Sequence, residues 1–245
     1  MRLLCVTAHP DDEAGGFGGT LLHYAQRGIE THILCLTPGQ AATNRGGAKS
    51  DDELAAMRRK EFAASCKILK VSHGEVLDYP DARLYRLDFY AVVEDLVRRL
   101  RSIRPQVVIT MGPEGSITAH PDHSMVSIFA TMAYHWAGRS NRFPEQLKQG
   151  LDVHQTQKLY YLTATFTIPE RPPVLLPPIT ATIDAAEFLE AKISAFKAHS
   201  SQAPLFARVE STVRQRGGKE HFHLAAAAKP GLVEQETDLF HGVSE

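Results

Sequence analysis

The sequence of 245 residues is 43% hydrophobic and 22% charged, which is the composition of a globular protein. The net charge of −1 gives no basic surplus for a nucleic-acid partner, and no run of about 18 apolar residues predicts a membrane span. The length suits one α/β domain, so we expect a single domain over residues 1–245.

Short apolar runs alternate with helical patterns through the first half of the chain. The run RLLCVTA is typical of a buried parallel strand, and Pro38 and Pro105 mark ends of such elements. Residues 39–50 are small, polar and glycine-rich, which predicts a loop. We predict strands at 2–8, 31–38, 75–79 and 106–111, and helices at 17–28, 51–69, 87–103 and 121–138. This alternation predicts an α/β fold with a Rossmann-like, mostly parallel sheet and helices on both faces.

The second half of the chain has a weaker pattern. Residues 158–165 could add a strand, and residues 185–199 have the spacing of a further helix. The proline-rich stretch 168–178 predicts an irregular crossing over the surface. Residues 216–245 show no clear pattern.

The three cysteines, Cys5, Cys35 and Cys66, are odd in number and form no CxxC pair. A disulfide framework is therefore not expected, and a reducing compartment fits better. Since no targeting segment appears either, we expect a cytoplasmic protein.

The first candidate for chemistry is AHPDDE, residues 8–13, directly after the first strand. His9 and Asp12 flank a tight turn, so that an imidazole and a carboxylate can converge on one ion. Asp11 lies between them and can point at a metal-bound water instead. The alternative is a helix start at which the acidic residues act only as caps.

The second candidate is AHPDH, residues 119–123, which follows the fourth strand through a Gly-Pro-rich loop. Its two histidines, His120 and His123, can share a face, so that one binds a metal while the other stays free for acid–base work. The alternative is two surface histidines beside a capping Asp122.

Together the two clusters indicate a catalytic metal. Both follow predicted strands, and in parallel sheets sites collect at the carboxyl ends of strands. Two histidines and one carboxylate leave positions open for water and substrate, which is typical of catalytic rather than structural zinc. Fe²⁺ or Co²⁺ could substitute, because such a site is not selective.

These motifs resemble the LmbE-like family of zinc deacetylases, which includes the N-acetylglucosaminyl-phosphatidylinositol de-N-acetylases (PIG-L). The resemblance also includes residues 58–61 (RRKE), 79–82 (YPDA) and 197–202 (KAHSSQ), and it therefore extends over most of the chain.

The resemblance implies a role for seven residues. It implies that His9, Asp12 and His123 bind the metal, that Asp11 is the general base, and that His120 stabilises or protonates the tetrahedral intermediate. It further implies that Arg58 and Asp81 contact the sugar; the alternatives are a surface helix residue and a turn residue.

We therefore expect a zinc-dependent de-N-acetylase that hydrolyses the acetamide of an N-acetylglucosamine-type substrate. The expected partner is a small N-acetylated sugar, with no nucleic acid and no membrane, and a homo-oligomer is left open. Two alternatives are a metal-bound sugar-binding module without turnover and a metallophosphoesterase on the same scaffold, although the latter usually needs two metals and more ligands.

Overall fold

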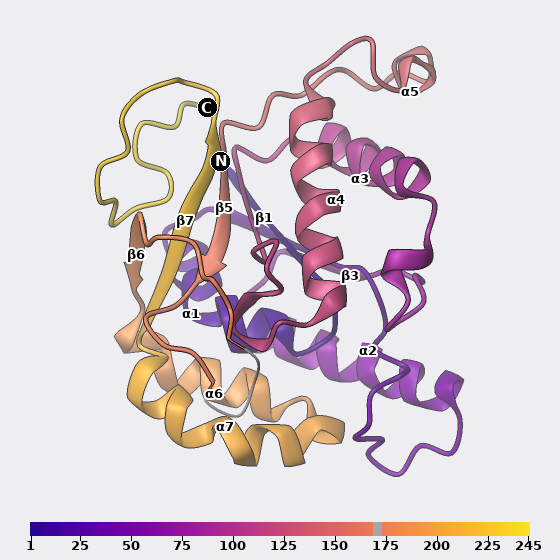
Figure 1. Ribbon diagram of the computed structural model, residues 1–245, viewed down its shortest axis with the longest axis vertical. Helices are drawn as coiled ribbons and strands as arrows, with labels where there is room; N and C mark the ends of the chain where they lie inside the picture. The colour runs from indigo at the N-terminus through magenta and orange to yellow at the C-terminus, as the bar shows by residue number, and fades with distance from the viewer. Residues whose placement is uncertain (169–172) are drawn as a thin grey trace.

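The computed structural model describes residues 1–168 and 173–245, and its centre is a seven-stranded sheet (Figure 1). The strand order is β3-β2-β1-β4-β5-β7-β6. The bounds are β1 Arg2–Thr7, β2 Glu30–Cys35, β3 His73–Val76, β4 Val107–Thr110, β5 Lys158–Thr163, β6 Ala181–Asp184 and β7 Lys219–Ala227.

The first five strands are parallel, as the alternation of strand and helix predicts. β1 lies at the centre of this part and pairs with β2 on one side and with β4 on the other. β7 alone departs from this direction, because it runs antiparallel between β5 and β6. The sheet is thus mostly parallel, and its carboxyl edge joins the ends of β1 and β4.

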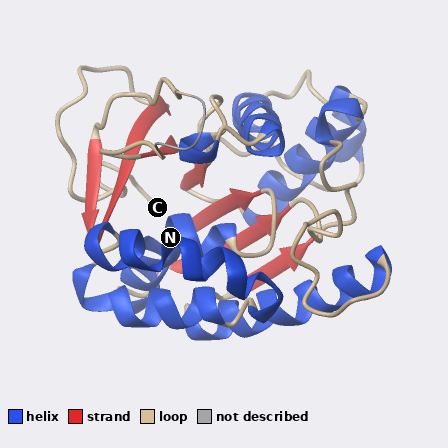
Figure 2. Ribbon diagram, turned by 60° about the horizontal axis from the view of Figure 1, so that its bottom comes forward, coloured by secondary structure: helices blue, strands red, loops and turns tan. Residues whose placement is uncertain are grey.

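Helices cover both faces of the sheet, as expected (Figure 2). The helix bounds are α1 Asp12–Gln26, α2 Asp51–Ile68, α3 Phe89–Ile103, α4 Pro121–Ala137, α5 Pro144–Lys148, α6 Leu189–Lys197 and α7 Ala203–Arg216. Successive strand side chains point to opposite faces. Leu3 and Cys5 accordingly pack in one apolar core with residues of α1, whereas Leu4 and Val6 pack in another with residues of α3 and α4.

Helix α1 begins at Asp12, five residues before the predicted start at 17. The prediction was late because its first turns hold four glycines, which disfavour helix in an isolated chain. Packing explains them: a Cβ on Gly19 would lie 2.5 Å from the Cβ of Ala185, so glycine permits the close contact between α1 and the segment before α6.

Four elements in the second half, α5, α7, β6 and β7, were not predicted. The predicted helix at 185–199 is shorter and corresponds to α6 with a preceding 3₁₀ turn. Residues 169–172 of the proline-rich stretch lie outside the described residues, and residues 173–178 have neither helix nor strand. Residues 39–50 also have neither, as predicted.

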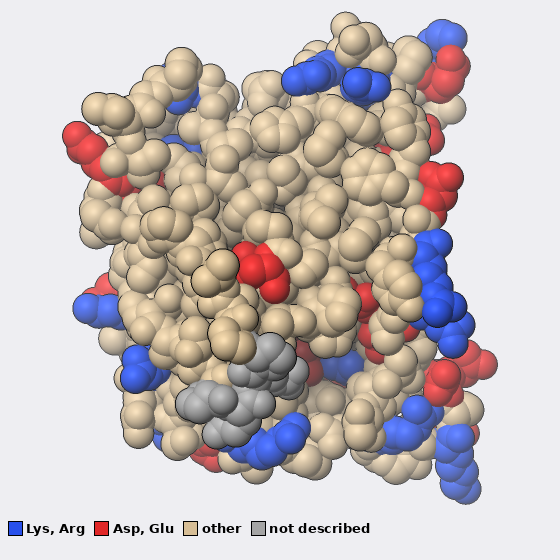
Figure 3. Space-filling view, viewed as in Figure 1, with Lys and Arg blue, Asp and Glu red and all other residues tan. Residues whose placement is uncertain are grey.

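The three cysteines of the described residues are free and buried. Among the described residues, no helix is both long and apolar enough to cross a membrane. On the face shown in Figure 3, basic and acidic side chains both occur around the edge and the basic ones do not gather into one patch.

Candidate metal centre

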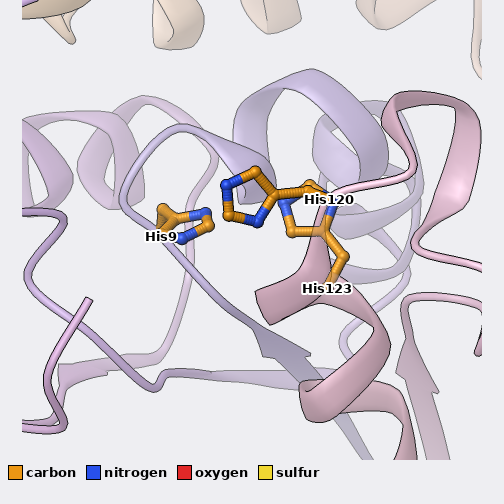
Figure 4. Close-up of side chains that lie close together, drawn as sticks. All are labelled: His9, His120 and His123. Carbon is orange, nitrogen blue, oxygen red and sulfur yellow. The ribbon is translucent and has the colours of Figure 1, made fainter. Parts of the chain in front are cut away.

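Three histidines meet at the carboxyl edge of the sheet, where β1 and β4 end (Figure 4). His9 follows β1, and His120 and His123 lie at the start of α4. The ring centroids are 4.8 Å apart for His9 and His120, 5.4 Å for His9 and His123, and 5.0 Å for His120 and His123. Because β1 and β4 are hydrogen-bonded neighbours, two motifs more than 100 residues apart share one site.

Asp12 lies between two of these imidazoles. Its Oδ2 accepts hydrogen bonds from the backbone N–H groups of His9 (2.8 Å) and Ala8 (3.1 Å), which fix the carboxylate in the turn. Its Oδ1 lies 3.2 Å from Nε2 of His123, and its Oδ2 lies 3.6 Å from Nδ1 of His9. The structure thus brings together the three side chains that the sequence predicts as ligands.

The outer ring nitrogens also have neighbours. Nδ1 of His123 lies 3.1 Å from the hydroxyl of Thr118. Nε2 of His9 lies 3.1 Å from Oδ1 of Asp81 and 3.5 Å from Oδ2 of Asp122, although without the alignment of a hydrogen bond. Such outer partners orient ligand imidazoles in metal sites.

The charges of the site fit a divalent cation. Four carboxylates that are buried or nearly so, Asp11, Asp12, Asp81 and Asp122, surround the histidines. Burial lowers the pKa of His9, but its contacts with Asp12, Asp122 and Asp81 outweigh burial and raise this pKa well above its usual value. The pocket therefore favours positive charge, and two imidazoles with a carboxylate are donors that suit zinc.

Asp11 is held in an unusual backbone conformation beside the ligands. Its φ of 117° lies in a region that side chains rarely adopt, which is common at functional sites. Nη2 of Arg58 donates to its Oδ2 (2.9 Å). Burial, opposed by the charge of Arg58, raises the pKa of Asp11 to about 6, which is a useful value for a base near neutral pH.

His120 has a defined tautomer. Its Nδ1 accepts a hydrogen bond from the backbone N–H of Asp122 (3.2 Å), so the proton of the neutral ring lies on Nε2. Burial, together with the charges of His9 and His123, lowers the pKa of His120 to about 4. A neutral ring with an N–H at Nε2 can donate a hydrogen bond to an oxyanion.

Arg58 and Asp81, which the family resemblance places against the sugar, both lie at the site. The Arg58 side chain is only 3% exposed, and its guanidinium donates to Asp11 and to the carbonyls of Pro10 and Gly39. Asp81 faces His9 and accepts from the backbone N–H of Ala41. These contacts hold parts of the site, and sugar contact by either residue stays a prediction.

Glu13 is a site residue for which the sequence analysis predicts no role beyond helix capping. It is fully buried and accepts from the Asp11 N–H (2.9 Å), from Oγ of Ser65 (2.5 Å) and from Nε2 of His199 (2.6 Å). Its position as third acid of AHPDDE was the available signal. His199 and Gln202, which belong to the KAHSSQ stretch of the family resemblance, are both buried.

Several known proteins are similar to this chain in both sequence and fold. A family model described as PIG-L, GlcNAc-PI de-N-acetylase, matches residues 4–134, which include all seven predicted site residues. The chain is 32% identical over 205 residues to the diacetylchitobiose deacetylase of Thermococcus kodakarensis, covering 83% of this chain and 70% of that protein.

Two further similarities extend over nearly the whole chain. A 1D-myo-inositol 2-acetamido-2-deoxy-alpha-D-glucopyranoside deacetylase of Catenulispora acidiphila is 28% identical over 296 residues, covering 98% of this chain and 97% of that protein. The structure of the N,N'-diacetylchitobiose deacetylase from Pyrococcus horikoshii superposes with a TM-score of 0.78 at 25% identity, covering 91% of this chain and 83% of that one. Each of these proteins is named a deacetylase.

Proposed function

Because this chain belongs to the PIG-L family of GlcNAc-PI de-N-acetylases, we propose that it is a zinc-dependent de-N-acetylase of an N-acetylglucosamine-type substrate. The products would be the free amine and acetate. The observation that carries the proposal is the convergence of AHPDDE and HPDH: three ligand side chains, a buried carboxylate and a neutral histidine meet at one sheet edge. A binding module without turnover would have no need of Asp11 there.

His9, Asp12 and His123 would hold the metal. Zinc bound at these residues would polarise the acetamide carbonyl and lower the pKa of a water, which is the chemistry that an unactivated amide needs. Fe²⁺ or Co²⁺ would be accepted by the same donors.

Asp11 would accept the proton of the attacking water. Arg58 holds Oδ2 of its carboxylate, so that Oδ1 remains for the water. A raised pKa makes Asp11 a stronger base than an exposed aspartate, and the proton it accepts is then available to the departing amine.

His120 would donate its Nε2–H to the developing oxyanion. The Asp122 N–H at Nδ1 keeps the proton on Nε2, and the lowered pKa keeps the ring neutral near pH 7. A donor fixed in place before the reaction stabilises developing charge without reorganisation.

The substrate class is proposed from the relatives' names, which share an acetamido-deoxyglucose unit. The loop 39–50 borders the site, since Gly39 contacts Arg58 and Ala41 contacts Asp81. We propose that Arg58 and Asp81 keep this loop beside the sugar and that the loop contacts the group attached to it.

The test is amine release from N-acetylglucosamine, diacetylchitobiose, an inositol glycoside of N-acetylglucosamine and an N-acetyl amino acid. Activity should disappear with a chelator and return with Zn²⁺, and kcat/KM should be highest for an acetamido sugar. Full activity in chelator would refute metal dependence. Preference for the N-acetyl amino acid would refute the sugar while leaving the amide chemistry intact.

A further inference from the structure

A second group of metal-binding side chains lies at the opposite, amino-terminal edge of the sheet. Glu30 and His32 are on β2, and His73 is the first residue of β3. Side chains alternate along a strand, so Glu30 and His32 share one face. In the parallel register His32 pairs directly with His73, which places the second imidazole beside the first. Local strand geometry alone therefore brings the three together.

The distances suit one ion. Oε1 of Glu30 lies 2.9 Å from Nε2 of His32 and 3.6 Å from Nε2 of His73. The two rings stack with centroids 4.9 Å apart, and one ligand atom from each of the three residues lies within 4.8 Å of the others. With zinc–ligand bonds of about 2.0–2.2 Å, two ligand atoms of a tetrahedral ion are about 3.3 Å apart.

The surroundings leave the donors available. Nε of Arg2 donates to Oε2 of Glu30 (3.0 Å), so Oε1 is the oxygen that faces the imidazoles. A glutamate is ordinarily charged and a histidine ordinarily mostly neutral near pH 7, and these are the forms that bind metal.

The group is separate from the catalytic centre and is open to solvent. In the β1–β2 register Glu30 pairs with Arg2, whereas the site residues follow Thr7 at the other end of β1, roughly 16 Å along the strand. The His73 side chain is 70% exposed, so an ion could enter and keep water at its remaining positions.

We propose that Glu30, His32 and His73 form a second site, for a divalent transition-metal ion such as Zn²⁺. Glutamate and imidazole are ligands that zinc accepts, and three protein ligands suffice when water completes the coordination. The ion would join the short edge strand β3 to β2, and β3 leads into the segment that carries Asp81.

Zinc titration of the metal-free protein by calorimetry tests the site. The whole chain should bind two equivalents, His73→Asn one, and the control His241→Asn, which removes another exposed histidine, two. His123→Ala should still bind the equivalent of zinc that depends on His73. The double variant, which carries both His73→Asn and His123→Ala, should bind none. Zinc should raise the melting temperature of His123→Ala but not that of the double variant.

Two results would overturn the site: a wild-type chain whose only equivalent of zinc depends on His123, or a second equivalent that persists in His73→Asn. Glu30→Gln, which keeps the shape of the side chain, gives an independent variant if His73→Asn fails to fold. Failure of the proposed function is distinguishable, because it concerns the equivalent that depends on His123.

Discussion

Replacing Glu13 by glutamine removes the buried charge to which His199, Ser65 and the Asp11 N–H all donate. Nδ1 of His199 is itself buried without a hydrogen-bond partner among the described residues, so Glu13 is the group that supports its charge. We expect the substitution to act twice, on the stability of the fold and on the position of the Asp11 backbone.

Glu220→Gln is a matched control. Glu220 is also buried and also accepts three hydrogen bonds, from the backbone N–H groups of Gly19 and Thr20 and from Nζ of Lys192. Both carboxylates therefore join α1 to the second half of the chain, but Glu220 contacts α1 one to two turns beyond the site.

Breaking a buried ion pair by removing one charge typically costs about 3–5 kcal/mol of the free energy of unfolding. For a chain of this size 1 kcal/mol corresponds to about 2–4 °C, so both variants should melt roughly 6–20 °C lower. Glu13→Gln should in addition lower kcat per folded molecule by about 10–100-fold, the usual effect of losing an outer partner of a metal site. Urea unfolding, metal content and kcat measured on the same samples give the comparison.

The loss of stability in Glu13→Gln depends on pH, and the sign of this dependence follows from the pKa of His199. Burial lowers the pKa of His199, but the charge of Glu13 outweighs burial and the pKa is raised above its ordinary 6.5; Asp11 raises it further and Arg58 lowers it. The contribution of His199 is then fully present below about pH 6.5 and is lost as the pH rises through the pKa of the folded state. The stability difference between wild type and Glu13→Gln should therefore shrink at alkaline pH.

An equal loss of kcat in both variants would refute the argument, since general loosening would then explain it. So would a Glu13→Gln variant as stable as the wild type at pH 6.

Four further predictions concern the site. Asp11→Asn should keep the metal, measured by elemental analysis, and lose about 10²–10⁴ in kcat. His123→Ala should lose nearly all catalytic metal, so that full retention would contradict its assignment as a ligand. Arg58→Lys should lower kcat more than it raises KM, because the single nitrogen of a lysine cannot reach the acceptors that Nη1 and Nη2 of Arg58 contact separately; a change confined to KM would favour the sugar contact. Gly39→Ala adds a Cβ that overlaps with the Arg58 guanidinium and should lower kcat, whereas Gly47→Ala, also at positive φ but with open space, should cost only about 1–2 kcal/mol of stability.

The site was predictable because its residues follow strands that apolar runs reveal. His9 and Asp12 come directly after β1, and His120 and His123 come after β4, so the rule for parallel sheets places them at one edge. The two motifs come together because β1 and β4 are neighbours in the sheet.

Other parts of the structure have no sequence pattern from which they could be predicted. β7 has alternating side chains, but the inward position of Glu220 is charged, which hides the apolar face of the strand. Helix α7 buries only Phe206 among its residues, so it lacks the apolar stripe by which helices are recognised. The pair of Glu13 and His199 joins residues 186 apart, which no local pattern can indicate.

The part of the chain beyond residue 134 supports the site although it contains none of the seven predicted site residues. Those residues fall within 4–134, the range of the family match. Asp11 and Asp12 lie at the start of α1, and this helix carries glycines that give it little stability of its own. His199 and Glu220, from beyond that range, contact the first and second turns of this helix through buried charges. A chain that ended after the family match would keep the seven predicted site residues, but it would lose the contact of His199 with Glu13 and the contacts of Glu220 with α1.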